Sequence, residues 1–165
     1  MAISTEILRS YRAPREVLRR QLDSPESEGR ALIYLTVACL LFFVAQWPRL
    51  SREAFLDPSI PLDARLGGAL MGWMFIAPLA FYAIGALSHI VARLLGGKGS
   101  FYGARLALFW SLLAIAPIAL LLGLVSGFIG QGPAQNVTGL LLLLAFLYIW
   151  MSGIWEAERH PDQPA

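Results

Sequence analysis

Charged and apolar residues are strongly segregated along this chain, and the segregation predicts helices that cross a membrane. No Asp, Glu, Lys or Arg occurs between Arg30 and Arg49, from residue 66 to 92, or from residue 106 to 155. A bilayer core about 30 Å thick requires about 20 apolar residues per helix, whereas a soluble core has no use for uncharged runs this long. The pattern therefore predicts an all-α, polytopic membrane helical bundle, and the mean hydropathy of +0.61 agrees with it.

The longest uncharged run contains a break. The segment "GQGPAQN" at 130–136 combines glycines, a proline and polar amides, which are turn signals. We therefore expect four transmembrane helices, at about 31–47, 67–92, 105–128 and 137–155. They form a membrane domain over residues 30–155, and a tail follows at 156–165. After Pro48 we expect a short separate helix near residues 50–56.

Residues 1–29 precede the first span and predict an amphipathic segment. Apolar residues from Ile7 to Leu22 recur at spacings of three and four, and arginines, including Arg15, Arg19 and Arg20, occupy the other face. An arginine-rich amphipathic helix beside a membrane is typical of binding to an anionic lipid surface. The alternative is a helix packed over the ends of the bundle, and the sequence leaves both open.

Basic residues also predict the orientation. With the N-terminus inside, ten Lys and Arg residues lie on the inner side and three on the outer side. The positive-inside rule then places both termini in the cytoplasm. Twelve arginines against one lysine indicate a GC-rich genome, so we expect the cytoplasmic membrane of a bacterium.

Two features suggest how the helices pack. Each of two spans has a central proline, Pro78 in "IAPLA" and Pro117 in "IAPIA", which we expect to kink its helix. Small residues at four-residue spacing allow close approach of helices, either within the bundle or with another membrane protein. These small residues are Gly68, Gly72, Ala119, Gly123 and Gly127.

Candidate chemistry is sparse. His89 is the single ionisable residue within a span, and it is either a buried polar site or a histidine hydrogen-bonded to a neighbouring helix. No carboxylate lies within a span, which argues against cation-coupled transport. "GGKGSF" lacks the phosphate-loop spacing, and no nucleophile or metal-ligand pattern is evident. We therefore expect no enzyme activity, no metal, no cofactor and no nucleic-acid partner.

The stretch "HIVARLLGGKGSFYGARLALFWSLLAIAP" at 89–117 resembles the Yip family of Ypt/Rab-interacting integral membrane proteins, in its bacterial branch. The resemblance lies in a basic, leucine-rich helix end, a Gly-Gly-basic-Gly-Ser-Phe loop and a helix with a central proline. "APREVLRRQL" at 13–22 is similar to the family's proline-led amphipathic helix. Family members commonly have five spans, so a fifth segment within the long second span stays open.

The resemblance implies a non-enzymatic membrane protein that acts through partners. Its eukaryotic relatives bind prenylated small GTPases and help shape or traffic membranes. We expect a scaffold or accessory subunit that contacts anionic lipid and another membrane protein, with a homo-oligomer open. The alternative is a small transporter or channel using the helices around Pro78 and Pro117. Besides the N-terminal arginines, the expected contact residues are Arg93, Gly96, Gly97, Lys98, Gly99, Phe101 and Arg105.

Overall fold

The computed structural model describes residues 3–159, and every regular element in that range is helical. The elements are α1 (Ile3–Ser10), α2 (Pro14–Leu22), α3 (Glu28–Leu56), α4 (Leu62–Met71), the π-helical turn η1 (Gly72–Ile76), α5 (Ala77–Leu94), α6 (Phe101–Phe128) and α7 (Pro133–Ala157). The all-α expectation is confirmed. The expected tail lies outside the described residues from position 160 onward, as does His160.

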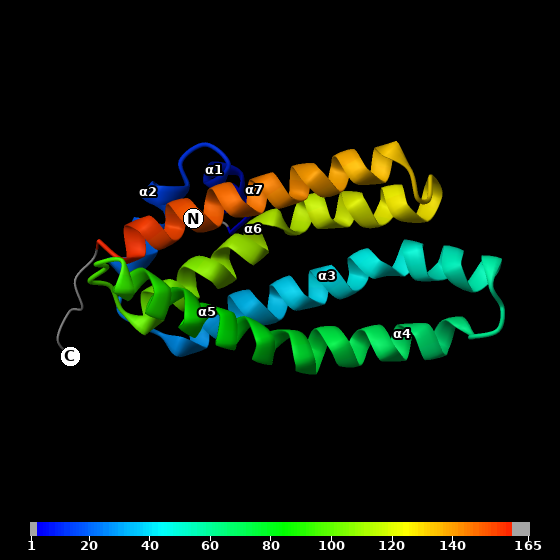
Figure 1. The fold of residues 1–165 in the computed structure, drawn as a ribbon, viewed down its shortest axis with the longest axis horizontal. Helices are drawn as coiled ribbons and strands as arrows, with labels where there is room; N and C mark the ends of the chain where they lie inside the picture. Colours follow the sequence, from blue (N-terminus) through cyan, green and yellow to red (C-terminus); the bar gives the residue numbers. More distant parts are fainter. Residues whose placement is uncertain (1–2, 160–165) are drawn as a thin grey trace.

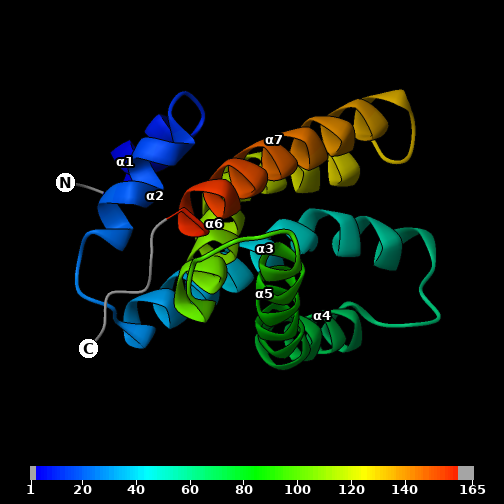
Figure 2. The ribbon, with the colours of Figure 1, turned by 60° about the vertical axis from the view of Figure 1, so that its left-hand side comes forward.

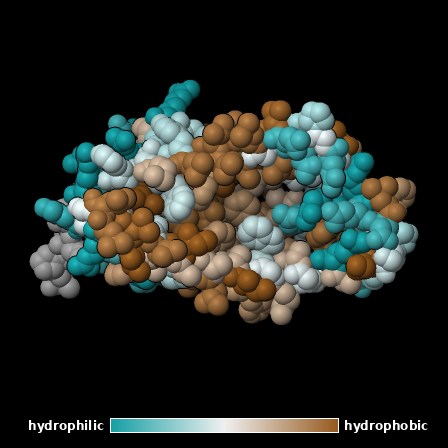
Figure 3. All heavy atoms as spheres, in the orientation of Figure 1, coloured by the Kyte–Doolittle hydropathy of each residue, from teal (hydrophilic) through white to brown (hydrophobic). Residues whose placement is uncertain are grey.

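Four helices are long and apolar enough to cross a membrane: α3, the continuous rod α4–η1–α5, α6 and α7. They lie side by side, and α6 is the most buried of them (Figure 1). We call the end with residues 95–100 the loop end and the opposite end the far end. On the face in Figure 3, hydrophobic residues cover the middle and hydrophilic residues gather toward both ends. This distribution suits a bilayer around the middle of the bundle.

The helices extend beyond the expected spans. The separate helix expected near residues 50–56 was wrong, because α3 continues through Pro48 to Leu56. A proline inside a helix removes one backbone hydrogen bond without necessarily ending it. Pro78 is the second residue of α5, two positions after the end of η1, and Pro117 lies exposed within an unbroken α6. A π-helical turn is one of the usual sources of helix irregularity, and η1 interrupts the α-helical hydrogen bonding of the second span shortly before Pro78. The kinks expected at the two prolines stay predictions.

Small residues form the contact between α3 and α6. Ala119, Gly123 and Gly127 are consecutive members of one stripe on α6. A Cβ atom at Gly123 would overlap the backbone carbonyl of Ala45, and one at Gly127 would overlap Pro48. By contrast, a Cβ atom at Gly68 or Gly72 would have no described atom within 4 Å. The stripe on α6 therefore serves packing within the bundle, whereas the pair on the second span faces outward.

The two N-terminal helices form a hairpin, which docks against the sides of α6 and α7. Figure 2 shows α1 and α2 beside α6 and α7. Val17 and Leu18 of α2 are fully buried, and the Leu18 side chain reaches the position of Gly153 on α7. At the tip, the indole Nε1 of Trp110 donates to the buried Ser10 hydroxyl at 2.9 Å. The hairpin therefore packs on the bundle, which is one of the two alternatives, although it lies along the helices instead of over their ends. Binding of its arginines to lipid stays a prediction.

The hairpin tip reaches deep along the bundle. The Tyr11 hydroxyl donates to the carbonyl of Ala114 at 2.6 Å, and burial raises the pKa of Tyr11, so this donor stays protonated. Ala114 lies about 20 Å along α6 from Phe101, at 1.5 Å per residue. Hydrogen bonds and packing together therefore fix the arginine-rich segment in one position.

The α3–α6 contact predicts a sharp difference between two glycine substitutions. Gly123→Ala forces a methyl group into the α3 backbone and should lower the free energy of unfolding by about 1–3 kcal/mol, the usual cost of overpacking. Gly68→Ala meets open space and should be neutral or slightly stabilising, since alanine favours helix. Thermal unfolding in detergent measures both, and equal melting temperatures would contradict the packing model.

The docked hairpin predicts protection from protease. Tyr11→Phe removes the bond to Ala114, which contributes about 1 kcal/mol and corresponds to about a fivefold change in an opening equilibrium. Trypsin should therefore cleave at Arg9 and Arg12 about five times faster. Tyr148→Phe, at a side chain that is 51% exposed on α7, is the matched control and should leave cleavage unchanged. Unaltered cleavage in Tyr11→Phe would show that the hydroxyl does not hold the hairpin.

Candidate functional site

The glycine-rich segment between α5 and α6 is a sharply defined turn. Gly96 has a φ of +94°, which favours glycine, and follows the last turn of α5. Its N–H donates to the backbone carbonyl of Arg93, and the N–H of Gly97 donates to the backbone carbonyl of Ala92 at 2.9 Å; the two bonds form a Schellman motif. Ser100 then caps α6 by accepting from the Gly103 N–H at 3.0 Å. The stretch therefore ends one helix and begins the next within five residues.

Glu158, just beyond α7, holds this turn in place. One carboxylate oxygen lies 2.9 Å from Nδ1 of His89, and the other accepts from the Gly99 N–H at 3.1 Å. The backbone carbonyl of Glu158 accepts from the Lys98 N–H at 3.0 Å. Because a carboxylate accepts, the geometry assigns a proton to Nδ1 of His89. We call these contacts of His89, Glu158 and residues 97–99 the Glu158 latch.

The Glu158 latch leaves no room for a side chain at two further glycines of the turn. A Cβ atom at Gly97 would overlap the Glu158 carboxylate, and one at Gly99 would overlap the carbonyl of Ala157. His89 is only 1% exposed and carries Phe101 against its ring, with centroids 4.3 Å apart. The side chain is therefore a hydrogen-bonded tie between α5 and the end of α7, which is the structural alternative that the sequence offered.

Two residues just after the turn point into the bundle. The Tyr102 side chain is buried, and its hydroxyl accepts from Arg30 at 2.9 Å. Arg105 was expected to face lipid phosphate, yet it forms an ion pair with Glu28 and lies over the ring of Tyr82. Both residues therefore join α6 to neighbouring helices.

The outward side of the turn is basic and apolar at once. Leu94 and Leu95 are 82% and 85% exposed, and Arg93 and Lys98 beside them are also exposed. Neither Arg93 nor Lys98 forms an ion pair within residues 3–159. Figure 3 shows a hydrophobic patch beside hydrophilic residues at this end of the molecule. We call these four residues the loop-end face.

A hollow of about 450 Å³ adjoins the loop-end face. Leu95, Met151, Ile154 and Trp155 line it, with Arg159 stacked over the Trp155 ring at 4.7 Å. The size lies within the range of about 300–1,000 Å³ typical of ligand pockets. Such a hollow, apolar with a cation at its rim, suits an apolar side chain or lipid chain next to an anionic group.

The N-terminal arginines divide into two groups. Arg15 and Arg19 are exposed on α2, whereas Arg20 is partly buried and pairs with Glu6 at 3.5 Å. The first two are therefore available for contacts with lipid or protein, and Arg20 contributes to the hairpin itself. Within residues 3–159, no group of three His, Cys, Asp or Glu side chains is placed to hold a metal ion.

Sequence reasoning missed Glu158, Ser10 and Trp110. Glu158 lies in what the sequence presents as a polar tail, and its one signal is that it closely follows the last apolar run. Ser10 interrupts the N-terminal segment next to Tyr11, and Trp110 lies inside an apolar helix. Their pairing across 100 residues is a tertiary property that no local pattern carries.

The latch predicts that one carboxylate protects the turn. Glu158→Ala removes the acceptor of the Gly99 N–H and leaves His89 buried without it, so hydrogen exchange at Gly99 should accelerate by about tenfold or more. Glu156→Ala, two residues earlier, is the control and should exchange at the wild-type rate. Mass-spectrometric hydrogen exchange on residues 95–100 gives the comparison, and equal protection in both variants would contradict the latch.

Comparison with known proteins agrees with this geometry. The family model described as the Yip1 domain matches residues 8–163, which is nearly the whole chain and includes α2, the turn and all four long helices. Neither the curated proteins nor the solved structures contain a significant match. The chain is a multi-pass membrane protein that belongs to the Yip1 domain family.

Proposed function

We propose that this protein is a scaffold or accessory subunit, which acts by binding lipid headgroups and another integral membrane protein through its loop end. Yip1-family proteins are membrane trafficking proteins and are not known enzymes, which supports a role in contact instead of catalysis. The proposed contact surface is the loop-end face with its adjoining hollow, extended by the exposed arginines Arg15 and Arg19.

The observation that carries the proposal is the exposure of Leu94 and Leu95 on a turn that is rigidly held. Both leucine side chains are more than four-fifths exposed. Covering each of them with an apolar partner contributes about 1.5–3 kcal/mol of favourable transfer free energy. The Glu158 latch fixes the backbone beneath them, so little ordering entropy is lost on binding. Arg93 and Lys98 supply the charge that selects an anionic surface or an acidic partner.

We also propose the membrane and the orientation. The loop end carries Arg93, Lys98 and Arg159, and the C-terminal end of α2 brings Arg19 and Arg20 toward it, so the positive-inside rule supports a cytoplasmic loop end. With four spans, both termini then lie in the cytoplasm. The arginine-rich composition supports the cytoplasmic membrane of a bacterium.

The alternative of a small transporter loses one of its supports. It would use Pro78, Pro117 and His89, but His89 is tied to Glu158 at the loop end and is almost inaccessible. A histidine engaged in this way stabilises helix packing and is poorly placed to bind a solute.

Replacing the charges on the loop-end face tests the proposal. The double variant Arg93→Ser, Lys98→Ser should lower recovery of a stoichiometric membrane partner by about tenfold, with unchanged insertion. Gly99 is left intact, because any side chain there would overlap the end of α7. The measurement is purification of the tagged full chain from its native membranes in mild detergent, followed by mass spectrometry.

The matched control keeps both charges, as Arg93→Lys with Lys98→Arg, and should recover the partner at the wild-type level. Full recovery with the serine variant would remove the loop-end face from the interaction. A clean monomer from the wild type would contradict the scaffold role itself.

A further inference from the structure

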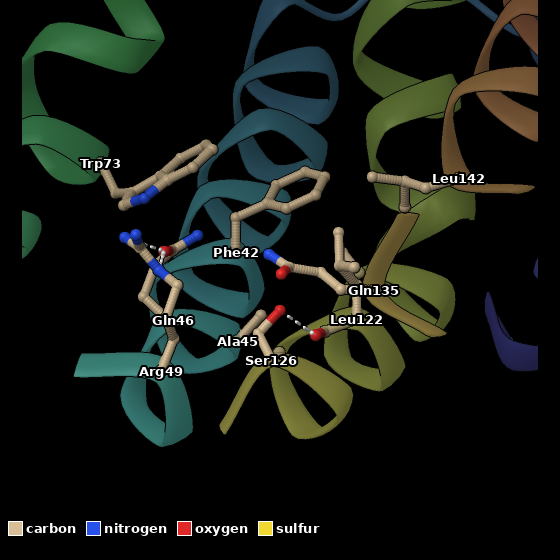
Figure 4. Close-up of a pocket in the computed structure, with 11 residues that line it drawn as sticks. Phe42, Ala45, Gln46, Arg49, Trp73, Leu122, Ser126, Gln135 and Leu142 are labelled. Carbon is tan, nitrogen blue, oxygen red and sulfur yellow. Dashed lines mark hydrogen bonds between the residues drawn. The ribbon is translucent and has the colours of Figure 1, made fainter. Parts of the chain in front are cut away.

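A second pocket, of about 320 Å³, lies toward the far end of the bundle, between α3, η1, α6 and α7 (Figure 4). Its floor is the contact between α3 and α6, where Ala45 meets Gly123, and η1 and α7 form its two sides. The volume is at the lower end of the range for small-molecule sites, about 300–1,000 Å³. It suits part of a ligand whose remainder lies outside the pocket.

The wall of the pocket that lies nearer the middle of the bundle is apolar and aromatic. Phe42 stacks on Trp73, with ring centroids 5.1 Å apart and an interplanar angle of 16°. Leu122 and Leu142 contribute from the opposite side. Trp73 belongs to the π-helical turn η1, a kind of turn that frequently marks functional sites. This wall offers a surface for a hydrocarbon chain.

The mouth of the pocket is polar and cationic. The side-chain oxygen Oε1 of Gln46 accepts from Nε and Nη2 of Arg49, at 3.1 and 2.9 Å, and Nη1 of Arg49 donates to the Glu53 carboxylate at 3.0 Å. A guanidinium has five N–H donors, so two remain free. Glu53 is itself shared with Arg65 at 3.6 Å, which reduces its repulsion of an anion. Across the mouth, the Gln135 carboxamide forms no hydrogen bond with residues 3–159.

On both α3 and α7, the polar lining residues lie nearer the far end of the bundle and the apolar ones nearer its middle. On α3, Phe42 lies one turn deeper than Gln46 and about two turns deeper than Arg49. On α7, Gln135 lies in the first turn and Leu142 about two turns deeper. Donors at the membrane surface above an apolar wall match a phospholipid, which has phosphate at the surface and acyl chains below.

We propose that this pocket binds one phospholipid of the leaflet at the far end. A segment of one acyl chain lies against Phe42, Trp73 and Leu142, and the phosphate accepts from Arg49 and Gln135. A free phosphate ester would occupy the mouth alone, and a neutral glyceride would occupy the wall alone. The phospholipid is the class that uses both.

Native mass spectrometry of the delipidated full chain tests the proposal, with phosphatidylglycerol as the probe and diacylglycerol and glycerol phosphate for comparison. We expect one molecule of phosphatidylglycerol to bind tightly and diacylglycerol to bind more weakly. Glycerol phosphate should not displace the bound phosphatidylglycerol. Leu142→Trp fills the pocket and should weaken lipid binding by about tenfold or more. Leu143→Trp, at the neighbouring residue that is 51% exposed, should bind as the wild type does.

A second variant tests the mouth without altering the wall. Arg49→Gln should weaken phosphatidylglycerol by about tenfold and leave diacylglycerol unchanged. Equal lipid retention by Leu142→Trp and the wild type would overturn the proposal, and so would equal loss in both tryptophan variants. Displacement by glycerol phosphate would mean a site for phosphate esters alone, and an Arg49→Gln variant with unchanged phosphatidylglycerol binding would mean that no phosphate is recognised.

Discussion

The close approach of α3 and α6 is the constraint on which the bundle depends. In lipid, an apolar side chain gains little by leaving one hydrocarbon environment for another, so helices associate through van der Waals contact and hydrogen bonds. At Gly123 and Gly127 the missing side chains let the backbones of the two helices touch directly. Because α6 is the most buried helix, its position against α3 fixes where α5, α7 and the N-terminal hairpin can pack.

The two ends of the bundle differ in how they are closed. At the loop end, the Glu158 latch and the Schellman motif satisfy the backbone of the turn and leave a rigid basic and apolar surface outside. Toward the far end, a pocket with an aromatic wall lies between η1 and α7, above the contact of α3 with α6. Rigid closure suits recognition by a partner, whereas an open pocket suits occupation by lipid.

Hydropathy predicted the four long helices well, because transmembrane length and apolarity are local properties of the sequence. The glycine turn was also predictable in kind, and Gly96 adopts the positive φ that a glycine at a helix end suggests. The need for glycine at positions 97 and 99 could not be predicted, because it depends on contacts with the segment around Glu158, about 60 residues away. Equally, periodicity showed that the N-terminal segment has an apolar face, but only tertiary contacts show that the face meets α6 and α7.

The position of the N-terminal hairpin has a consequence for how the protein is made. A chain is synthesised from its N-terminus, and N-terminal segments generally fold first. Here the surface against which the hairpin docks consists of Ala107, Trp110 and Ala114 of α6 and Gly153 of α7. The two helices of the hairpin are made before α6 and α7, so they must wait, undocked, until both of these spans have been inserted. Their docking marks the completion of the whole bundle, so an assembly factor or a protease that senses a free hairpin would distinguish unfinished molecules from finished ones.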